Sequence, residues 1–560
     1  MIDPCPPLYR PPSGGSRPLV LDRYQLLNTL QAPRLARLPV NPLLREAHSP
    51  AGRRLFGVLL LGALGYTFAS LGLAVRDSGA SLPLGVPLMI LLAALLVALG
   101  FEFINGFHDT ANAVATVIYT HALPPQAAVA WAGTCNLLGV LFSSGAVAFG
   151  IVALLPLDLL LRLDSQAGLA MIFALLIASI LWNLGTWWLG LPVSSSHTLI
   201  GSIVGVGLAH GALQGHLGLS GGAWAQLLKV IEALLLSPLV GFVMAALLLL
   251  ALKRLVRHRQ LFRAPEGRQP PPWGIRLLLI LTCTGVSFAH GSNDGQKGIG
   301  LIMLILCACL PLTFALDRAQ PPGELQRLYQ LANQGQQHLA RLAPGEHPAQ
   351  PREVLLGYQQ DGRLTPEVLP ALAAQLGSIA HTLHGQTTLA ELDEPRTLAL
   401  HNALYLSVET IRQLDGTERV FDLETWSTLQ ALRSQALDAI RFIPAWVKVA
   451  VALALGLGTL VGWRRIVTTV GEGIGKAPLT YAQGATAQLT AMLTIGAADG
   501  FGLPVSTTHV LSSAVAGTMT ANGSGLQRQT LRNMLLAWVL TLPAAVGLAA
   551  GLYWLFVRVL

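Results

Sequence analysis

The sequence predicts an all-α polytopic membrane protein built on an internal duplication, and three observations support that prediction. Of the 560 residues, 52% are hydrophobic and 11% are charged, less than half of the roughly 25% charged share of soluble domains. Apolar stretches long enough to cross a hydrocarbon core as helices recur along the chain. Two polar motifs each occur twice. These features exclude a soluble enzyme, a nucleic-acid-binding protein and a disordered scaffold.

Composition divides the chain into segments of different kinds. We expect a cytoplasmic Pro/Arg-rich tail (1–54), an extra transmembrane helix (55–75), a first transmembrane repeat (83–252), a basic cytoplasmic loop (253–276), the first part of a second repeat (277–316), an acidic extracytoplasmic helical insert (317–441) and the second part of that repeat (443–560). The apolar stretches predict spans at 55–75, 83–103, 127–155, 167–190, 233–252, 277–289, 298–316, 445–463 and 534–557. Shorter apolar pieces at 111–119, 198–209, 484–497 and 508–519 predict half-helices or re-entrant segments.

The distribution of charge predicts the orientation. The loop 253–276 carries seven Lys or Arg and a single acid, Glu266, and such basic loops stay in the cytoplasm. The N-terminal tail then also lies in the cytoplasm. The insert 317–441, with 15 acids and 10 arginines, lies on the opposite side, which is the periplasm in a Gram-negative cell. We therefore expect a multi-pass protein of the inner (cytoplasmic) membrane, embedded in the lipid bilayer with its basic loops in the cytoplasm. Because the location of these loops explains the net positive charge, we expect no nucleic-acid partner.

The duplication is visible in the two motifs. Gly100–Asp109 (GFEFINGFHD) lines up with Gly285–Asp294 (GVSFAHGSND), 185 positions later. Leu191–His197 (LPVSSSH) recurs as Leu503–His509 (LPVSTTH), 312 positions later. This offset exceeds the first by 127, which is close to the length of the insert. The predicted orientation makes the first copy run inward and the second outward, an inverted-topology repeat. Secondary transporters with such repeats bind substrate at the midplane between broken helices, so we expect breaks at the two aspartates.

The residue types in these motifs suit an anion that travels with cations. An ionised carboxylate in a bilayer costs at least about 2.5 kcal/mol, so Asp109 and Asp294 must face a cavity or a partner. The second motif predicts the start of a half-helix, where free amides and hydroxyls bind an oxyanion such as phosphate. A phosphate dianion beside two carboxylates requires a co-ion. Protons, sodium or a metal complex could supply it, and Lys297, matched by Asn112 in the first copy, adds a fixed cation.

These arguments give two sets of candidate residues and no catalytic residue. The hydroxyls could simply cap helices, and the histidines could simply donate hydrogen bonds inside the bundle. The predicted substrate-binding residues are Asp109, Asn112, Ser194, Ser195, Ser196, Thr198, Asp294, Gln296, Lys297, Ser506, Thr507 and Thr508. The residues predicted to couple a proton or cation are His108, Asp109, His197, Asn293, Asp294 and His509. The spacing of cysteines indicates neither a disulfide framework nor a metal site, and we expect no resident cofactor.

At these residues the chain resembles the Pit family of inorganic phosphate transporters, above all its low-affinity, proton-coupled bacterial members. The resemblance covers about 83–316 and 443–557. It implies uptake of phosphate driven by protons, with the substrate entering as a neutral complex with Mg²⁺ or another divalent metal, and it is compatible with a homodimer. The matching stretches are Phe103–Thr120, Trp182–Gly201, His290–Met303, Gly462–Arg465, Tyr481–Gly484 and Pro504–Thr518.

One departure from the family bears on coupling. Sodium-coupled relatives carry Gly-Ala-Asn-Asp-Val-Ala-Asn in both copies, whereas here the copies read Gly106–Asn112 (GFHDTAN) and Gly291–Lys297 (GSNDGQK). A lysine in place of asparagine could replace a bound sodium ion by a tethered charge, which favours proton coupling.

Several alternatives stay open. A sulfate or other oxyanion permease and a sodium-coupled phosphate symporter use the same kind of site. A passive anion channel would carry current insensitive to the pH gradient. A membrane-embedded hydrolase is disfavoured, because the duplication gives two equivalent half-sites with no order of nucleophile, base and orienting group.

Overall fold

The computed structural model describes residues 50–162, 165–215, 221–267, 269–343, 348–415 and 421–559, and these are helical apart from turns and loops. Within those ranges the only β-type pairing is an isolated bridge between Gly475 and Leu526. The predicted tail 1–54 lies outside the described residues up to residue 49.

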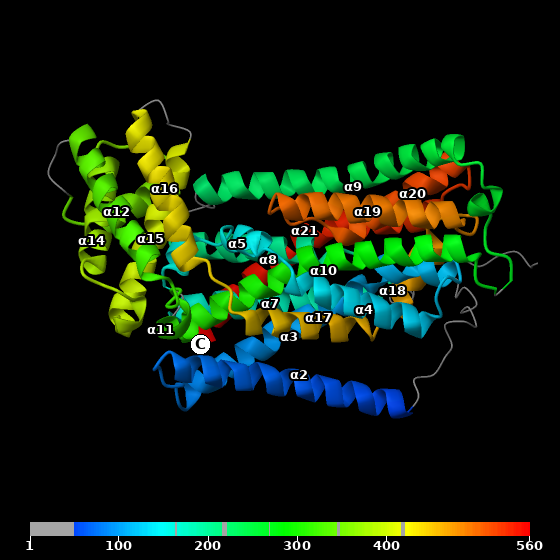
Figure 1. Cartoon of the computed structure of the whole chain (residues 1–560), viewed down its shortest axis with the longest axis horizontal. Coiled ribbons are helices and arrows are strands. Elements are labelled where there is room, and N and C mark those ends of the chain that lie inside the picture. Colours follow the sequence, from blue (N-terminus) through cyan, green and yellow to red (C-terminus); the bar gives the residue numbers. More distant parts are fainter. Residues whose placement is uncertain are drawn as a thin grey trace, which may run out of the picture. The chain divides into compact units, whose positions relative to one another are not determined.

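Helices long enough to cross a membrane dominate the structure (Figure 1). Among the described residues seven helices qualify by length and apolar character, or up to nine if two bent pairs each form one span. The protein is a multi-pass membrane protein. Outside the insert the helices are α2 (Pro50–Asp77), α3 (Val86–Tyr119), α4 (Pro125–Leu141), α5 (Ala146–Val152), α6 (Leu157–Leu160), α7 (Gln166–Trp188), α8 (Ser195–Leu213), α9 (Gly221–Leu255), the 3-10 helix η2 (Arg259–Phe262), α10 (Trp273–Cys309), α11 (Pro311–Phe314), α17 (Ala445–Thr459), α18 (Arg464–Thr468), the π-helix η5 (Thr469–Gly473), α19 (Tyr481–Gly500), α20 (Thr507–Asn522) and α21 (Arg528–Val559).

The helices that carry the two aspartates are continuous, so the predicted breaks at Asp109 and Asp294 are wrong. α3 runs for 34 residues through Asp109, and α10 runs for 37 residues through Asp294. The pieces predicted at 83–103 and 111–119 lie in one helix. α10 joins the span predicted at 277–289 to the larger part of the span predicted at 298–316, up to Cys309, and α11 follows. The physical reason is burial: nearly every residue around each aspartate faces other helices, so the polar stretch keeps its helical backbone without exposure to lipid.

The breaks lie instead at the second motif. α8 begins at Ser195 and α20 at Thr507, each following a proline-containing loop. The Ser194 hydroxyl accepts a hydrogen bond from the His197 amide at 3.1 Å, which caps α8. In the second copy Ser506 caps α20 through the His509 amide, also at 3.1 Å. The predicted helix starts are therefore confirmed. A further bend divides the predicted span 127–155 into α4 and α5, which meet at 75°.

The two halves of the chain interlock through glycines. α3 packs on α17 and α10 packs on α4, so each motif helix has a close neighbour from the other half. A Cβ atom at Gly106 would lie 2.2 Å from the carbonyl oxygen of Leu455, and one at Gly291 would lie 2.1 Å from that of Asn136. Only glycine permits this approach of one backbone to another.

Replacing Gly291 by alanine is expected to lower the melting temperature of the detergent-solubilised protein clearly, because the added methyl overpacks a site with no free space, at a cost of about 1–3 kcal/mol or more. Thermal unfolding followed by intrinsic fluorescence measures the effect. Gly185→Ala is the matched control, since a Cβ there meets nothing within 4 Å. Equal melting temperatures for Gly291→Ala and wild type would contradict the close packing.

The insert forms a helical group at one end of the bundle (Figure 1). Leucines such as Leu328, Leu376 and Leu429 form its own apolar core. α2, the extra helix, lies along the outside of the bundle in Figure 1 and buries only Thr67, Leu71 and Val75. The elements of the insert are α12 (Pro322–Leu342), α13 (Pro351–Asp361), α14 (Val368–Leu383), the 3-10 helix η3 (Leu389–Glu391), α15 (Glu394–Gln413) and α16 (Leu423–Ile440).

Candidate functional site

The two aspartates, which are 185 positions apart in sequence, meet at one serine. The Ser195 hydroxyl lies 3.2 Å from Asp109 Oδ2 and 3.4 Å from Asp294 Oδ2. All three residues are buried, at 2% exposure or less. Ser195 is also the first residue of α8, so the amino end of that helix lies between the carboxylates contributed by α3 and α10.

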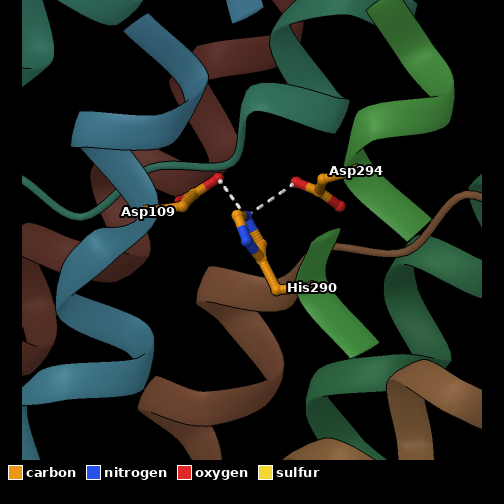
Figure 2. Close-up of side chains that lie close together, drawn as sticks. All are labelled: Asp109, His290 and Asp294. Atoms are coloured by element: carbon orange, nitrogen blue, oxygen red, sulfur yellow. Dashed lines mark ion pairs between the residues drawn. The ribbon is translucent and has the colours of Figure 1, made fainter. Parts of the chain in front are cut away.

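A histidine joins the two carboxylates. Figure 2 shows His290 of α10 between them, with its Nε2 3.7 Å from Asp109 Oδ2 and 3.5 Å from Asp294 Oδ2. One ligand atom from each of the three residues lies within 4.8 Å of the others. Two carboxylates and an imidazole form a donor set that suits a divalent cation such as Mg²⁺, Mn²⁺ or Zn²⁺.

Matched positions in the two copies bind the aspartates through different chemistry. Lys297 Nζ lies 2.7 Å from Asp294 Oδ2, one helical turn away, and 3.4 Å from the Ser195 hydroxyl. In the first copy Asn112 Nδ2 donates to Asp109 Oδ1 at 3.2 Å and to the Thr508 hydroxyl at 3.0 Å. One carboxylate is thus neutralised by a buried ammonium group, and the other is bound by an amide.

The amino end of α20 reaches the same place from the second half of the chain. The Thr508 hydroxyl donates a hydrogen bond to Asp109 Oδ1, and the centroids of the His197 and His509 rings lie 4.5 Å apart. The first amides of α8 and α20 have no partner within their own helices. Some buried polar atoms in this cluster also lack a hydrogen-bond partner among the described residues, as expected where a ligand binds: Asn112 Oδ1, Asp294 Oδ1, Thr507 Oγ1, His197 Nδ1 and His509 Nε2.

Known proteins share this arrangement of sequence. The family model described as the phosphate transporter family matches residues 105–549, which include both aspartates and both serine-rich loops, the segments Leu191–His197 and Leu503–His509. The chain belongs to the phosphate transporter family. Two relatives in Escherichia coli (strain K12), the low-affinity inorganic phosphate transporters PitB and PitA, are each 42% identical over 84% of this chain and 97% of their own. A solved structure, the sodium-dependent phosphate transporter, covers 84% of this chain and 100% of that chain, with 19% identity and a TM-score of 0.46. The resemblance to the Pit family is confirmed.

Some predicted site residues of this family member point away from the aspartates. Thr198 donates to Asn183 Oδ1 at 3.0 Å, between α7 and α8. Ser196 donates to the Val505 carbonyl at 2.8 Å. The amide groups of Asn293 and Gln296 bond elsewhere, to Leu503 and to Asp499. Ser194 and Ser506 serve as helix caps at the edge of the cluster.

The structure also places three residues at the site or beside it that the sequence analysis did not select: His290, Glu102 and Asp499. His290, the counterpart of Asn105, supplies the imidazole that lies between the two aspartates. Of the two aspartates, the selected His108 contacts only Asp109, at 3.6 Å from Oδ1. Glu102 is fully buried against α10, where a Cβ on Gly298 would lie 2.2 Å from its Cγ. A charged residue inside an apolar span was the available signal for Glu102. Asp499, near the end of α19, lies beside the site and bonds to α10.

Proposed function

We propose that this family member imports inorganic phosphate, as a neutral complex with a divalent metal, in symport with protons by alternating access. The observation that supports this most directly is the convergence of Asp109 and Asp294, one from each copy of the motif, on Ser195 at the amino end of α8. A buried site shared by two repeats suits a substrate that must be reached from both sides in turn.

The two halves of the substrate would bind to different groups. The phosphate oxygens need donors, and the free amides of α8 and α20 together with the Thr507 and Ser195 hydroxyls offer them. The metal ion needs carboxylate and imidazole ligands, which Asp109, His290 and Asp294 offer together. A metal phosphate without net charge also avoids the repulsion that a bare dianion would meet beside two carboxylates.

Proton coupling is favoured by the fixed charge on Lys297. Its ammonium group is buried, at 0% exposure, against Asp294, where a sodium ion would otherwise have to balance the carboxylate. His108 and His290 both contact Asp109, so imidazole groups, which can exchange protons near neutral pH, lie beside the Asp109 carboxylate.

The proposed orientation has the amino-terminal tail and the loop 253–276 in the cytoplasm and the insert in the periplasm. The seven basic residues of that loop support it. Figure 1 also shows the insert at the end of the bundle opposite to the connection between α9 and α10.

Phosphate uptake into proteoliposomes is expected to require an inward proton gradient, to rise when Mg²⁺ is added and to be indifferent to sodium. The three gradients are varied one at a time with labelled phosphate, and protein-free liposomes and a protonophore serve as controls. Sulfate in large excess is expected to leave uptake unchanged, because near neutral pH it carries no proton to share with a carboxylate.

The other outcomes identify the alternatives. Uptake that follows a sodium gradient and ignores the pH gradient would make the protein a sodium-coupled symporter. Strong competition by sulfate would indicate a general oxyanion permease, and phosphate flux without any response to ion gradients would indicate a channel.

A further inference from the structure

Asp499, near the end of α19, is an acid that the proposed phosphate site does not use. Its Oδ2 accepts a hydrogen bond from the Ser292 hydroxyl at 2.6 Å, and its Oδ1 accepts one from Gln296 Nε2 at 2.6 Å. Both donors lie on α10 and are buried, at 6% and 0% exposure. The Gln296 oxygen in turn accepts from the Val147 amide of α5 at 2.9 Å. Asp499 therefore fastens the end of α19 to α10.

Helix α10 carries the residues that contact Asp499 on one face and Asp294, the carboxylate of the proposed phosphate site, on the opposite face. Ser292 and Gln296 are four residues apart and share one face of α10. Asp294 lies midway between them in sequence, about 200° around the helix, where it faces Ser195. A second bond, from Asn293 Nδ2 to the Leu503 carbonyl at 3.1 Å, ties the loop 501–506 to α10 as well. That loop ends at Ser506, the cap of α20.

The first copy of the repeat fills the matched positions with aromatic rings. By the motif offsets, Asp499 corresponds to Trp187 and Ser292 to Phe107. The rings of Phe107 and Trp187 meet edge to face, with centroids 5.1 Å apart. In each copy, therefore, a residue of the helix that carries the aspartate contacts a residue just before the serine-rich loop. The contact is apolar in the first copy, between Phe107 and Trp187, and is a hydrogen bond to a carboxylate in the second, between Ser292 and Asp499.

The loop of the first copy, residues 189–194, is fastened by further contacts at the end of α7, which precedes it. Trp187 Nε1 donates to the Gly462 carbonyl at 2.8 Å, and Arg465 donates to the Trp188 carbonyl at 2.8 Å. The Arg465 guanidinium group also lies over the Trp188 ring, 4.7 Å from its centroid. The two loops are therefore fastened to their neighbouring helices by different side chains, and one hydrogen bond, from Ser196 to the Val505 carbonyl, joins the second loop to the start of α8.

We propose that Asp499 is a positioning residue of the transport cycle: its hydrogen bonds to Ser292 and Gln296 keep the loop 501–506 closed against α10, and release of these bonds opens the site on that side only. The proposal rests on the proposed function insofar as the site carries phosphate. A carboxylate that accepts two short hydrogen bonds fixes the loop strongly and directionally. Because the other loop is held by the contacts of Trp187 and Arg465, loss of the Asp499 hydrogen bonds leaves that side fastened, as alternating access requires.

Thiol reactivity tests the proposal without phosphate. In the full chain with all five native cysteines replaced by serine, Val505→Cys places a thiol in the second loop and Val193→Cys places one in the first, at positions that are 3% and 0% exposed. Asp499→Asn is expected to raise the rate at which a methanethiosulfonate reagent modifies Val505→Cys by at least about tenfold, the effect of losing roughly one charged hydrogen bond. The rate at Val193→Cys should stay the same.

The reverse pattern is expected for Trp187→Ala, which should expose Val193→Cys and leave Val505→Cys protected. An unchanged rate at Val505→Cys in the Asp499→Asn variant would overturn the proposal. So would a parallel rise at both positions, because that result indicates general loosening of the fold.

Transport kinetics provide the second readout. Asp499→Asn is expected to raise the KM for phosphate at least about tenfold, with Asp499→Glu recovering most of the loss and the exposed Asp361→Asn behaving as wild type. If Asp499→Glu is as impaired as Asp499→Asn while Asp361→Asn is normal, the carboxylate has no role in closing the loop. The thiol measurement needs no transported substrate, so it stays readable even if the proposed function fails.

Discussion

Asp109→Asn and Asp294→Asn are each expected to reduce phosphate uptake by at least about a hundredfold, a loss of close to 3 kcal/mol in a buried charged site. Asparagine preserves the shape of the side chain and one acceptor oxygen, so the contacts with Ser195 can persist. It removes the negative charge that would bind the metal ion and that faces His290 and Lys297. Initial rates of labelled phosphate uptake in proteoliposomes measure the effect.

The control for these two variants is Asp361→Asn, which makes the same chemical change at an exposed position of the insert. Elution as a single species in detergent and an unchanged helical circular dichroism spectrum show that the variants fold. Uptake near the wild-type rate in either variant would remove that carboxylate from the mechanism.

Lys297→Asn is expected to abolish proton-driven uptake and to make the remaining uptake depend on sodium. The change gives the second copy the residue that Asn112 supplies at the matched position of the first. It leaves the buried Asp294 carboxylate beside the His290 ring but without the ammonium group that contacts it at 2.7 Å. Removing one partner of a buried ion pair costs about 3–5 kcal/mol, and a sodium ion can restore the balance. Uptake and thermal stability are measured with and without sodium.

Lys297→Arg keeps the charge and serves as the comparison for that experiment. If sodium rescues neither uptake nor stability of Lys297→Asn, the idea that the lysine replaces a bound sodium ion is wrong. Proton-driven uptake at the wild-type rate in Lys297→Asn would show that the ammonium group has no part in coupling.

Local chemistry explains which predictions succeeded. The starts of α8 and α20 follow from a proline, a capping serine and an apolar run, and all of these act within one turn of helix. The contact between Lys297 and Asp294 likewise follows from their helical spacing of three residues. The contact of Ser195 with two carboxylates depends on packing between segments that are distant in sequence. The duplicated motif predicted that its copies meet, but it could not predict which side chains come into contact.

The error at the aspartates has an identifiable source. A run of glycine and polar residues in an apolar sequence resembles a broken helix, but Gly106 and Gly291 are there to admit neighbouring backbones. Treating α10 as continuous would have changed two assignments. His290, four residues before Asp294, falls on the aspartate's face, and Gln296, two residues after it, falls on the opposite face.

The interlocking of the two halves has a consequence for biogenesis. Thr110 on α3 donates to the Thr459 carbonyl on α17 at 3.1 Å, across 349 positions of sequence. At a synthesis rate of about 5–20 residues per second, the ribosome makes α17 on the order of 20 to 70 s after α3. Throughout that interval α3 lacks its α17 neighbour, so the first half of the chain can complete its packing only after the second half has been inserted.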